Sequence, residues 1–182
     1  METFTKPRDF VENPRYLEDR KVFLSTIDFH TIDQPIMAIV EKFAMLPYCF
    51  SLQSCYGHFL YSSEQDTHNL GRLPTRDVGL VTYRIAYMAF CLESSQSGIE
   101  LFNALSRIPE IDPDFVQFGS ADWFWERYLN SYVLQVEPAR HMNKDQVIVE
   151  HSEAQHIQRI RDLFFTRIAE LLESQHGECR KG

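Results

Sequence analysis

The chain has 182 residues, 44% hydrophobic and 24% charged, a balance typical of one globular domain over residues 1–182. Its formal net charge of −8 argues against a protein that binds nucleic acid over its whole surface by neutralising phosphates. No apolar run approaches the ~18 residues of a membrane span, and residues 1–9 lack the apolar core of a signal peptide. The sequence therefore predicts a cytoplasmic protein with no membrane partner, whose cysteines stay reduced.

Hydrophobic periodicity divides the chain into helices and strands. Apolar residues spaced by three and four indicate helices, and alternation of apolar with polar residues indicates strands. The helices are expected at residues 14–27, 34–45, 97–108 and 153–174. The strands are expected at residues 48–54, 58–61, 82–92, 115–118 and 129–136. This order favours an α+β (mixed α/β) protein in which helices pack on a mixed β-sheet.

Polar residues near the expected helix ends suggest how those helices begin. Asp33 precedes the second helix, and Ser97 and Ser152 each stand three residues before a Glu or a Gln, which is the capping-box pattern. The polar residues of the last helix, Arg161 among them, are expected on its solvated face. Between the strand pair and the next strand lies a long irregular loop, residues 62–79, and a loop of this length is more often functional than idle.

A strand with an unusually polar face leads into a turn at residues 54–58. Cys49, Ser51, Gln53 and Cys55 share that face. Backbone N–H groups and hydroxyls at a strand end suit a small polar ligand, so we predict a ligand site at this turn. A carboxylate at the end of another strand, just before Pro138, is expected to face the same kind of cleft. The predicted site residues are Ser51, Gln53, Ser54, Cys55, Gly57, His58 and Glu137.

The same turn allows three other interpretations. Cys55 and His58 are a nucleophile–base pair if the thiol is activated and the base lies within hydrogen-bond reach. Cys49, Cys55 and His58 together offer three soft ligands for zinc, although the cysteine spacing is not that of a recurrent zinc knuckle. In the structural alternative, Ser54 and Gly57 only shape the turn, and the cysteines pack as small hydrophobic side chains.

Aromatic residues are concentrated in one segment, residues 122–127, where they lie between charged residues. Trp and Phe rings there are able to stack on a nucleobase or an adenine ring. A dense aromatic run is more often part of the core with a half-buried rim. Both interpretations stay open from the sequence.

Two segments of the chain resemble the wybutosine-synthesis tRNA methyltransferase family. They are residues 32–41, IDQPIMAIVE, and residues 47–58, PYCFSLQSCYGH. The family's signature is a helix led by Asp, a short strand, and a Ser-Ser-Cys-Ser-Gly-Arg turn. Three residues match that turn, namely Ser54, Cys55 and Gly57. Gln53 and Tyr56 replace its first and third Ser, and His58 replaces its Arg.

The resemblance implies that this protein is a distant member of a transferase family. That family acts at the third step of wybutosine synthesis in tRNA. Those enzymes use S-adenosylmethionine to methylate a hypermodified guanine. The resemblance therefore implies the family's fold, S-adenosylmethionine as cofactor, tRNA as partner, and a nucleoside-like or amino-acid-like ligand at the Ser54–His58 turn. His58 is then the candidate catalytic proton acceptor. The alternative is a non-catalytic ligand-binding or regulatory protein that keeps the fold, which the replacement of the family's Arg favours.

Overall fold

The computed structural model describes residues 4–141 and 144–179, with side chains described up to residue 175. Within these residues the strands are β1 (Phe4–Thr5), β2 (Cys49–Cys55), β3 (His58–Leu60), β4 (Leu80–Arg84), β5 (Ala86–Leu92), β6 (Val116–Ala121), β7 (Ser131–Val136) and β8 (Gln146–Glu150). The α-helices are α1 (Tyr16–Thr26), α2 (Met37–Met45), α3 (Gln96–Leu105), α4 (Asp122–Trp125) and α5 (His151–Cys179). Short 3-10 helices lie at η1 (Phe29–Thr31), η2 (Gln34–Ile36), η3 (Ile108–Ile111) and η4 (Ala139–His141).

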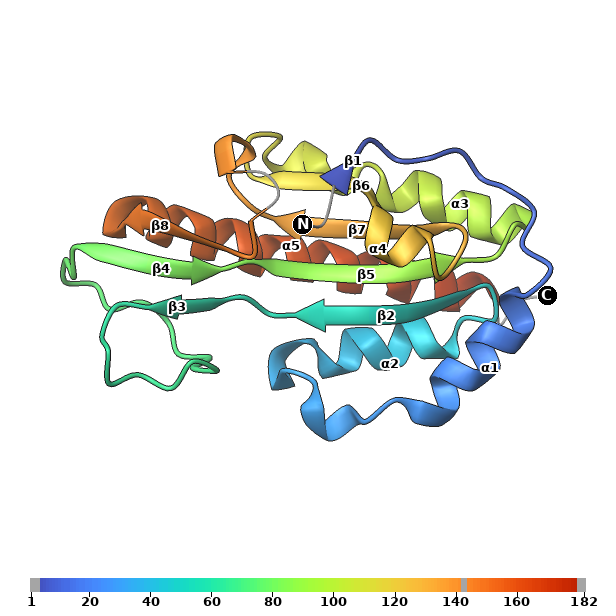
Figure 1. Ribbon diagram of the computed structural model, residues 1–182, viewed down its shortest axis with the longest axis horizontal. Coiled ribbons are helices and arrows are strands. Elements are labelled where there is room, and N and C mark those ends of the chain that lie inside the picture. Colours follow the sequence, from blue (N-terminus) through green and yellow to red (C-terminus); the bar gives the residue numbers. More distant parts are fainter. Residues whose placement is uncertain (1–3, 142–143, 180–182) are drawn as a thin grey trace.

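The strands form two sheets, in the orders β1-β6-β7-β5-β2 and β3-β4-β8 (Figure 1). The predicted α+β class is confirmed. Each strand pairing between described residues is antiparallel, so the sheet is not the mixed one that the sequence predicted. Parallel neighbours require a long crossover between adjacent strands. Here the neighbours β2 and β5, and β6 and β7, run in opposite directions instead.

Two long segments of chain cross from one sheet to the other. β2 and β3 are separated only by Tyr56 and Gly57, and β4 and β5 only by Ile85. β2 pairs with β5 and β3 pairs with β4, so the two segments form one long interrupted hairpin. The single strand predicted over residues 82–92 is thus broken in two. At the break, the N–H of Ile85 donates to the carbonyl of Asp145 rather than to β2. The sheets part at this point.

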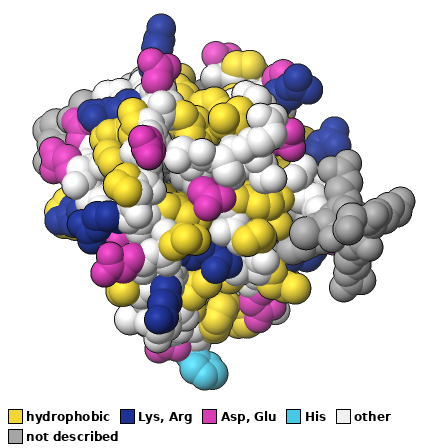
Figure 2. All heavy atoms as spheres, turned by 90° about the vertical axis from the view of Figure 1, so that its right-hand side faces the viewer, with side chains coloured by type: hydrophobic (Ala, Val, Ile, Leu, Met, Phe, Trp, Pro, Cys, Tyr) yellow, Lys and Arg dark blue, Asp and Glu magenta, His cyan; other side chains and the backbone are white. Residues whose placement is uncertain are grey.

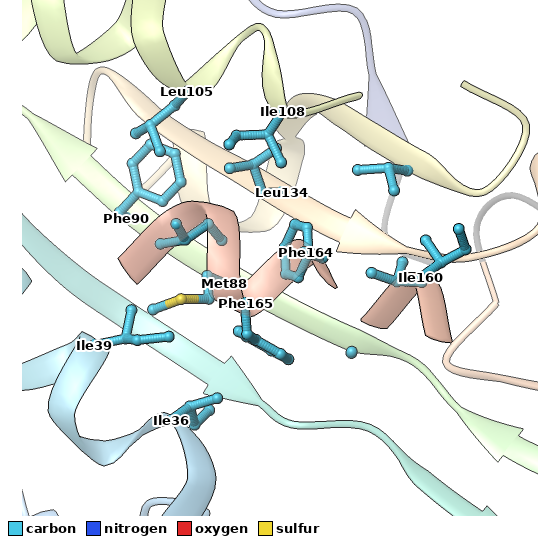
Figure 3. Packing of buried hydrophobic residues seen from close by; sticks show 14 of the residues in the cluster. Ile36, Ile39, Met88, Phe90, Leu105, Ile108, Leu134, Ile160, Phe164 and Phe165 are labelled. Carbon is cyan, nitrogen blue, oxygen red and sulfur yellow. The ribbon is translucent and has the colours of Figure 1, made fainter. Parts of the chain in front are cut away.

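The largest hydrophobic cluster connects both sheets to α2, α3 and α5. Figure 3 shows Met88 and Phe90 of β5, Leu134 of β7 and Phe164 of α5 within this cluster. Tyr83 of the three-stranded sheet belongs to the same buried cluster. The helix α5 runs behind both sheets and contacts β4, β7 and β8 (Figure 1). Because one contiguous core normally marks one domain, the two sheets are parts of the same packing unit.

The helices agree closely with the sequence patterns, but their capping residues differ. The hydroxyl of Ser95 accepts a hydrogen bond from the N–H of Gly98 at 3.3 Å, so Ser95 rather than Ser97 caps α3. Ser152 lies inside α5, which begins one residue earlier, and the predicted cap there is wrong. Asp33 precedes η2 but makes no side-chain cap bond. Its carboxylate is used elsewhere.

The sequence patterns do not predict three short elements, but they do predict one irregular segment. β1, α4 and β8 are not predicted, whereas residues 62–79 contain neither helix nor strand, as predicted. β1 has only two residues, and β8 buries only Val147 and Val149. Such short patterns are weak signals. Among the helices of the described residues, none combines the length and the apolar composition that crossing a membrane requires.

Candidate functional site

A pocket of about 800 Å³ lies beside the point where the two sheets part. Its charged and polar lining residues come from η1–η2, β2, β3, the irregular segment, β4, β7 and the loop before β8. They are Thr31, Asp33, Gln53, Ser54, Cys55, His58, His68, Arg84, Gln135, Glu137, Lys144 and Asp145. Its aromatic lining residues are Phe4, Tyr87 and Phe124. Pockets that hold small ligands in proteins are of this size.

Most of the predicted site residues meet at this pocket. The five that line it are Gln53, Ser54, Cys55, His58 and Glu137. Ser51 does not line it. The pairing of β2 with β5 shifts register between Ser51 and Gln53, which breaks the alternation that put both on one face, and Ser51 is buried in the sheet. Gly57 also lies outside the lining and acts through its backbone.

Gly57 is required by the shape of the turn. Its φ of +86° lies in the left-handed region that side chains disfavour. A Cβ atom built at Gly57 would lie 2.9 Å from the Cβ of Ala86, because the two crossing segments of the hairpin approach closely here. The turn therefore places Cys55 and His58 on either side of a position that only glycine fills without strain.

The centre of the site is a cluster of Asp33, Cys55 and His58, here called the pocket triad. One carboxylate oxygen, the thiol sulfur and one ring nitrogen all lie within 4.8 Å of one another. Oδ2 of Asp33 accepts a hydrogen bond from the N–H of Tyr56 at 2.7 Å and lies 3.5 Å from Nε2 of His58. The sequence pattern assigned Asp33 to a helix cap, because a residue before a helix carries no local sign of a contact made so much later in the chain.

The charge state of the pocket triad follows from these contacts. The hydrogen bond to Asp33, then the one to Cys55, raise the pKa of His58 to about 10, although burial opposes the shift. Burial alone would raise the pKa of Asp33, but the hydrogen bonds from His58 and from the Tyr56 amide outweigh it and lower that pKa. The pair is therefore imidazolium and carboxylate at neutral pH. The prediction that His58 accepts a proton does not fit this state, because an imidazolium donates.

The two alternative chemistries at the turn are changed by the structure. Sγ of Cys55 accepts a hydrogen bond from the N–H of Gly57 at 3.4 Å and lies beside His58. A protonated His58 cannot remove a proton from the thiol, so a nucleophile–base pair does not fit this charge state. Cys49 is fully buried at the opposite end of β2 and is not part of the triad. The zinc-ligand set Cys49, Cys55 and His58 is therefore not assembled.

The turn is supported from behind by a second cluster, here called the Arg161 network and made of Arg161, Asp162, Tyr56 and Arg72. Arg161 is 1% exposed; its Nη1 donates to the carbonyl of Gly57 at 3.0 Å, and its Nη2 lies 2.9 Å from Oδ1 of Asp162. Its guanidinium lies 4.0 Å from the centre of the Tyr56 ring. The prediction of a solvated Arg161 is wrong, because α5 packs against both sheets and buries more than its apolar stripe.

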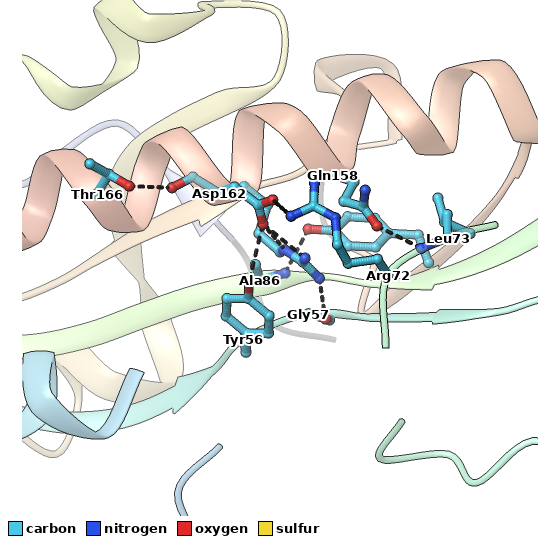
Figure 4. A network of polar contacts seen from close by, with 10 residues as sticks. Tyr56, Gly57, Arg72, Leu73, Ala86, Gln158, Asp162 and Thr166 are labelled. Carbon is cyan, nitrogen blue, oxygen red and sulfur yellow. Dashed lines mark hydrogen bonds and ion pairs between the residues drawn. The ribbon is translucent and has the colours of Figure 1, made fainter. Parts of the chain in front are cut away.

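The Arg161 network also holds the irregular segment against α5 (Figure 4). Nη1 of Arg72 lies 3.1 Å from Oδ2 of Asp162, and the N–H of Leu73 donates to Oε1 of Gln158 at 2.7 Å. Earlier in the same segment, the ring of His68 lies 5.8 Å from that of His58. The segment therefore contacts both α5 and the pocket triad.

Glu137, at the end of β7, provides a second carboxylate in the pocket lining. The residue is fully buried, and Nε2 of Gln135 donates to its Oε2 at 2.9 Å. The N–H of Lys144 donates to Oε1 at 3.2 Å. Burying a carboxylate is costly unless it is hydrogen-bonded, so these bonds stabilise Glu137 where it lies.

The aromatic segment at residues 122–127 divides between the two expected roles. Trp125 packs in the hydrophobic core and Phe124 lines the pocket. Trp123 is half exposed, and the guanidinium of Arg127 lies 3.2 Å from the centre of its ring. Of the aromatic residues in this segment, Phe124 is the one that lines the pocket and is placed to stack on a ligand there.

Fold and site define an α+β protein with two antiparallel sheets. Described residues of both sheets line a polar pocket. No family model matches the chain, and no curated protein matches it significantly. Among solved structures, "Structure of PH1069 protein from Pyrococcus horikoshii" is similar, with a TM-score of 0.43 and 12% identity over 90% of this chain and 93% of that one. So distant a likeness carries no argument about the site.

Proposed function

We propose that this protein binds a small ligand with nucleoside-like and amino-acid-like parts in the pocket and transfers a methyl group from S-adenosylmethionine. The observation that supports the proposal is the composition of one cavity of about 800 Å³. Carboxylates of Asp33 and Glu137 face the same cavity as His58 and Arg84. A lining with both signs of charge suits a ligand that carries both an ammonium and a carboxylate group.

The lining residues fit the chemical groups of that cofactor. Glu137 offers a buried carboxylate to an ammonium group, and His58 as imidazolium offers a positive charge near a ligand carboxylate. Phe124 and Tyr87 offer ring faces to a purine. When bound, S-adenosylmethionine supplies a methyl group activated by a sulfonium centre.

The protein's own contribution is alignment and charge. His58 is 2% exposed, and its orientation is fixed by Asp33 on one nitrogen and by the carbonyl of Asn69, 3.3 Å away, on the other. A positive charge that is held in this way attracts an anionic group of a ligand without having to move a proton. Holding two reactants in the correct relative geometry lowers a barrier by several kcal/mol, about 7–11 in the best cases.

Isothermal titration of the metal-free protein with S-adenosylmethionine and with S-adenosylhomocysteine tests the binding. We expect saturable heat from both compounds, and at least about a tenfold loss of affinity in Glu137→Gln, because a charge-assisted hydrogen bond contributes about 1.5–3 kcal/mol. Glu173→Gln is the matched control, since Glu173 is paired with Lys42 on the surface at 2.7 Å. No heat from either compound with folded protein contradicts the proposal.

A non-catalytic binding protein is the second candidate, and the charge state of His58 favours it. An imidazolium at the turn holds a ligand but removes no proton from an acceptor. At the end of the molecule in Figure 2, Lys and Arg side chains alternate with Asp and Glu, and the formal net charge is −8. These charges do not favour a large polyanionic acceptor. Incubation with S-adenosylmethionine and bulk tRNA separates the candidates. S-adenosylhomocysteine formed only when tRNA is present supports the enzyme, and binding without product supports the binding protein.

A further inference from the structure

We infer that the pocket triad of Asp33, Cys55 and His58 is a binding site for a zinc-like divalent cation, with a coordination position open to the pocket. The inference does not rest on the proposed methyl transfer. Its basis is the mutual distance of the three donor atoms, which all lie within 4.8 Å of one another. The three residues come from η1–η2, β2 and β3, so the fold, not one local motif, assembles them.

The donor set selects the class of cation. Thiolate and imidazole are the ligands of zinc and related borderline metals, whereas magnesium and calcium take oxygen ligands. A tetrahedral zinc with bonds of about 2.0–2.3 Å has ligand atoms roughly 3.3–3.7 Å apart. Nε2 of His58 and Oδ2 of Asp33 are already 3.5 Å apart. The remaining pairs lie within 4.8 Å, so they need to approach by at most about 1 Å, which side-chain rotation of Cys55 is able to supply.

Each of the three ligands already has a backbone partner that orients it. Nδ1 of His58 lies 3.3 Å from the carbonyl of Asn69, which leaves Nε2 facing the triad. The N–H of Gly57 donates to Sγ of Cys55 at 3.4 Å. The N–H of Tyr56 donates to Asp33. Metal-binding histidines almost always donate their other ring N–H to such an acceptor.

The fourth position lies on the pocket side. All three ligands line the pocket, so a cation held by them faces the cavity and not the core. Three protein ligands and one open position are typical of zinc sites that bind a water or a small ligand, whereas structural zinc sites are closed by four protein ligands. The cation would therefore add a positive centre to a lining that also contains Glu137 and Arg84.

Cobalt(II) is the probe for this site, because it reports on thiolate ligation by its absorption spectrum. The untagged protein is stripped with a chelator, dialysed and titrated with Co²⁺ and then with competing Zn²⁺. We expect one Co²⁺ per chain, a thiolate-to-cobalt charge-transfer band, and displacement by Zn²⁺. In Cys55→Ser the band disappears and affinity falls by at least about 100-fold. Cys91→Ser is the matched control, because the buried Cys91 lies outside the triad and a serine keeps the donation to the Leu129 carbonyl.

Two results overturn the inference. One is the absence of stoichiometric binding by the folded wild-type protein, and the other is an unchanged spectrum and affinity in Cys55→Ser. Asp33→Asn gives a second test if Cys55→Ser does not fold, since its amide oxygen still accepts from Tyr56 but no longer carries charge. That variant is expected to keep the charge-transfer band while losing affinity about tenfold or more. All titrations omit S-adenosylmethionine, so failure of the methyl-transfer proposal leaves these outcomes unaffected.

Discussion

The turn between β2 and β3 carries a cluster of charged side chains on each of its two sides, and the clusters differ in what encloses them. On the α5 side, the Arg161 network is closed: the guanidinium is 1% exposed and is bonded to the Gly57 carbonyl and to Asp162. On the opposite side, the pocket triad lines a cavity of about 800 Å³. Both contain charges paired by hydrogen bonds, but only the second borders a space that a ligand can occupy.

The comparison separates charges that stabilise the fold from charges that are candidates for chemistry. A buried ion pair whose partners are all supplied by the protein has no free direction for a ligand, and its loss is a loss of stability. A pair that borders a cavity keeps such a direction. Variants on the two sides of the turn should therefore differ in kind, with the largest stability losses on the α5 side.

Removal of the buried guanidinium is expected to have the largest effect. Arg161→Met keeps most of the side-chain volume but leaves the Gly57 carbonyl without its donor, so we expect a loss of about 3–5 kcal/mol in the free energy of unfolding. Denaturant unfolding measures it. Arg72→Gln is the matched control on the same carboxylate, and because the Arg72 side chain is 70% exposed we expect a loss below about 1 kcal/mol. Equal losses would show that the network is not closed around Arg161.

The two glycines with positive φ test the close approach at the turn. Gly57→Ala meets both an unfavourable φ and the Cβ of Ala86 at 2.9 Å, so we expect a loss of about 2–4 kcal/mol. Gly79→Ala has a φ of +76° but open space around its Cβ, so only the backbone cost of about 1–2 kcal/mol applies. Thermal or denaturant midpoints of the two variants make the comparison. A smaller loss at Gly57 than at Gly79 contradicts the packing described here.

The ion pair of the pocket triad predicts a pH-dependent contribution to stability. The pKa of His58 is about 10 in the folded protein against 6.5 for the free side chain, so its contribution is complete below pH 6.5 and disappears as the pH rises toward 10. The pKa of Asp33 is lowered from 3.8, so its contribution is complete above that pH and is lost as the pH falls through the lower value. The free energy of unfolding of the wild type should therefore exceed that of His58→Gln by about 2 kcal/mol. This difference should be largest between the lowered pKa of Asp33 and pH 6.5.

Denaturant unfolding of both proteins across this pH range, with a chelator present, measures the difference. The difference should shrink steadily from pH 6.5 to pH 10. His156→Gln is the control for the loss of an imidazole paired with a carboxylate at a partly exposed position. Nε2 of His156 lies 3.1 Å from Oδ2 of Asp112. A difference between wild type and His58→Gln that is constant with pH would mean that His58 is neutral in the folded protein.

The smallest stability effect is expected at Cys55. Its side chain is only partly buried at the pocket, so Cys55→Ala should lower the free energy of unfolding by less than about 1 kcal/mol. Cys91→Ala removes a fully buried sulfur and should cost about 1–2 kcal/mol. Titration with S-adenosylmethionine should show the reverse order, with a loss of affinity in Cys55→Ala only. Two variants with the same stability loss and unchanged ligand binding would assign Cys55 to the scaffold.

The sequence predicted the site residues that belong to local patterns, but not the contacts between residues far apart in the chain. The polar strand face, the glycine turn and the carboxylate before Pro138 are local patterns, and Gln53, Ser54, Cys55, His58 and Glu137 do line the pocket. Asp33 was assigned to a helix cap because its partner, the Tyr56 amide, is 23 residues away. Apolar periodicity locates the apolar stripe of α5 but not the full width of its buried face, so it predicts a solvated Arg161 where the structure buries this residue.

Prediction of the fold was limited by the same distinction. Long, strongly periodic segments such as α2 and α5 were located closely, because many residues repeat one pattern. The antiparallel pairing of β1 with β6 joins residues more than a hundred positions apart and leaves no periodic trace. The break at Ile85 was also hidden, since an apolar residue in an apolar run does not reveal that its N–H bonds outside the sheet.

The arrangement of support around Gly57 has a consequence for the order in which the protein is completed during synthesis. The arginine that holds the Gly57 carbonyl is made 104 residues after the glycine. A ribosome that adds about 5–20 residues per second therefore exposes the turn for several seconds before its support exists. During that interval the strand pair β2–β5 is able to form, but the turn lacks the guanidinium of Arg161 and the helix α5 that packs against it. The pocket should therefore mature last, when the C-terminal helix docks.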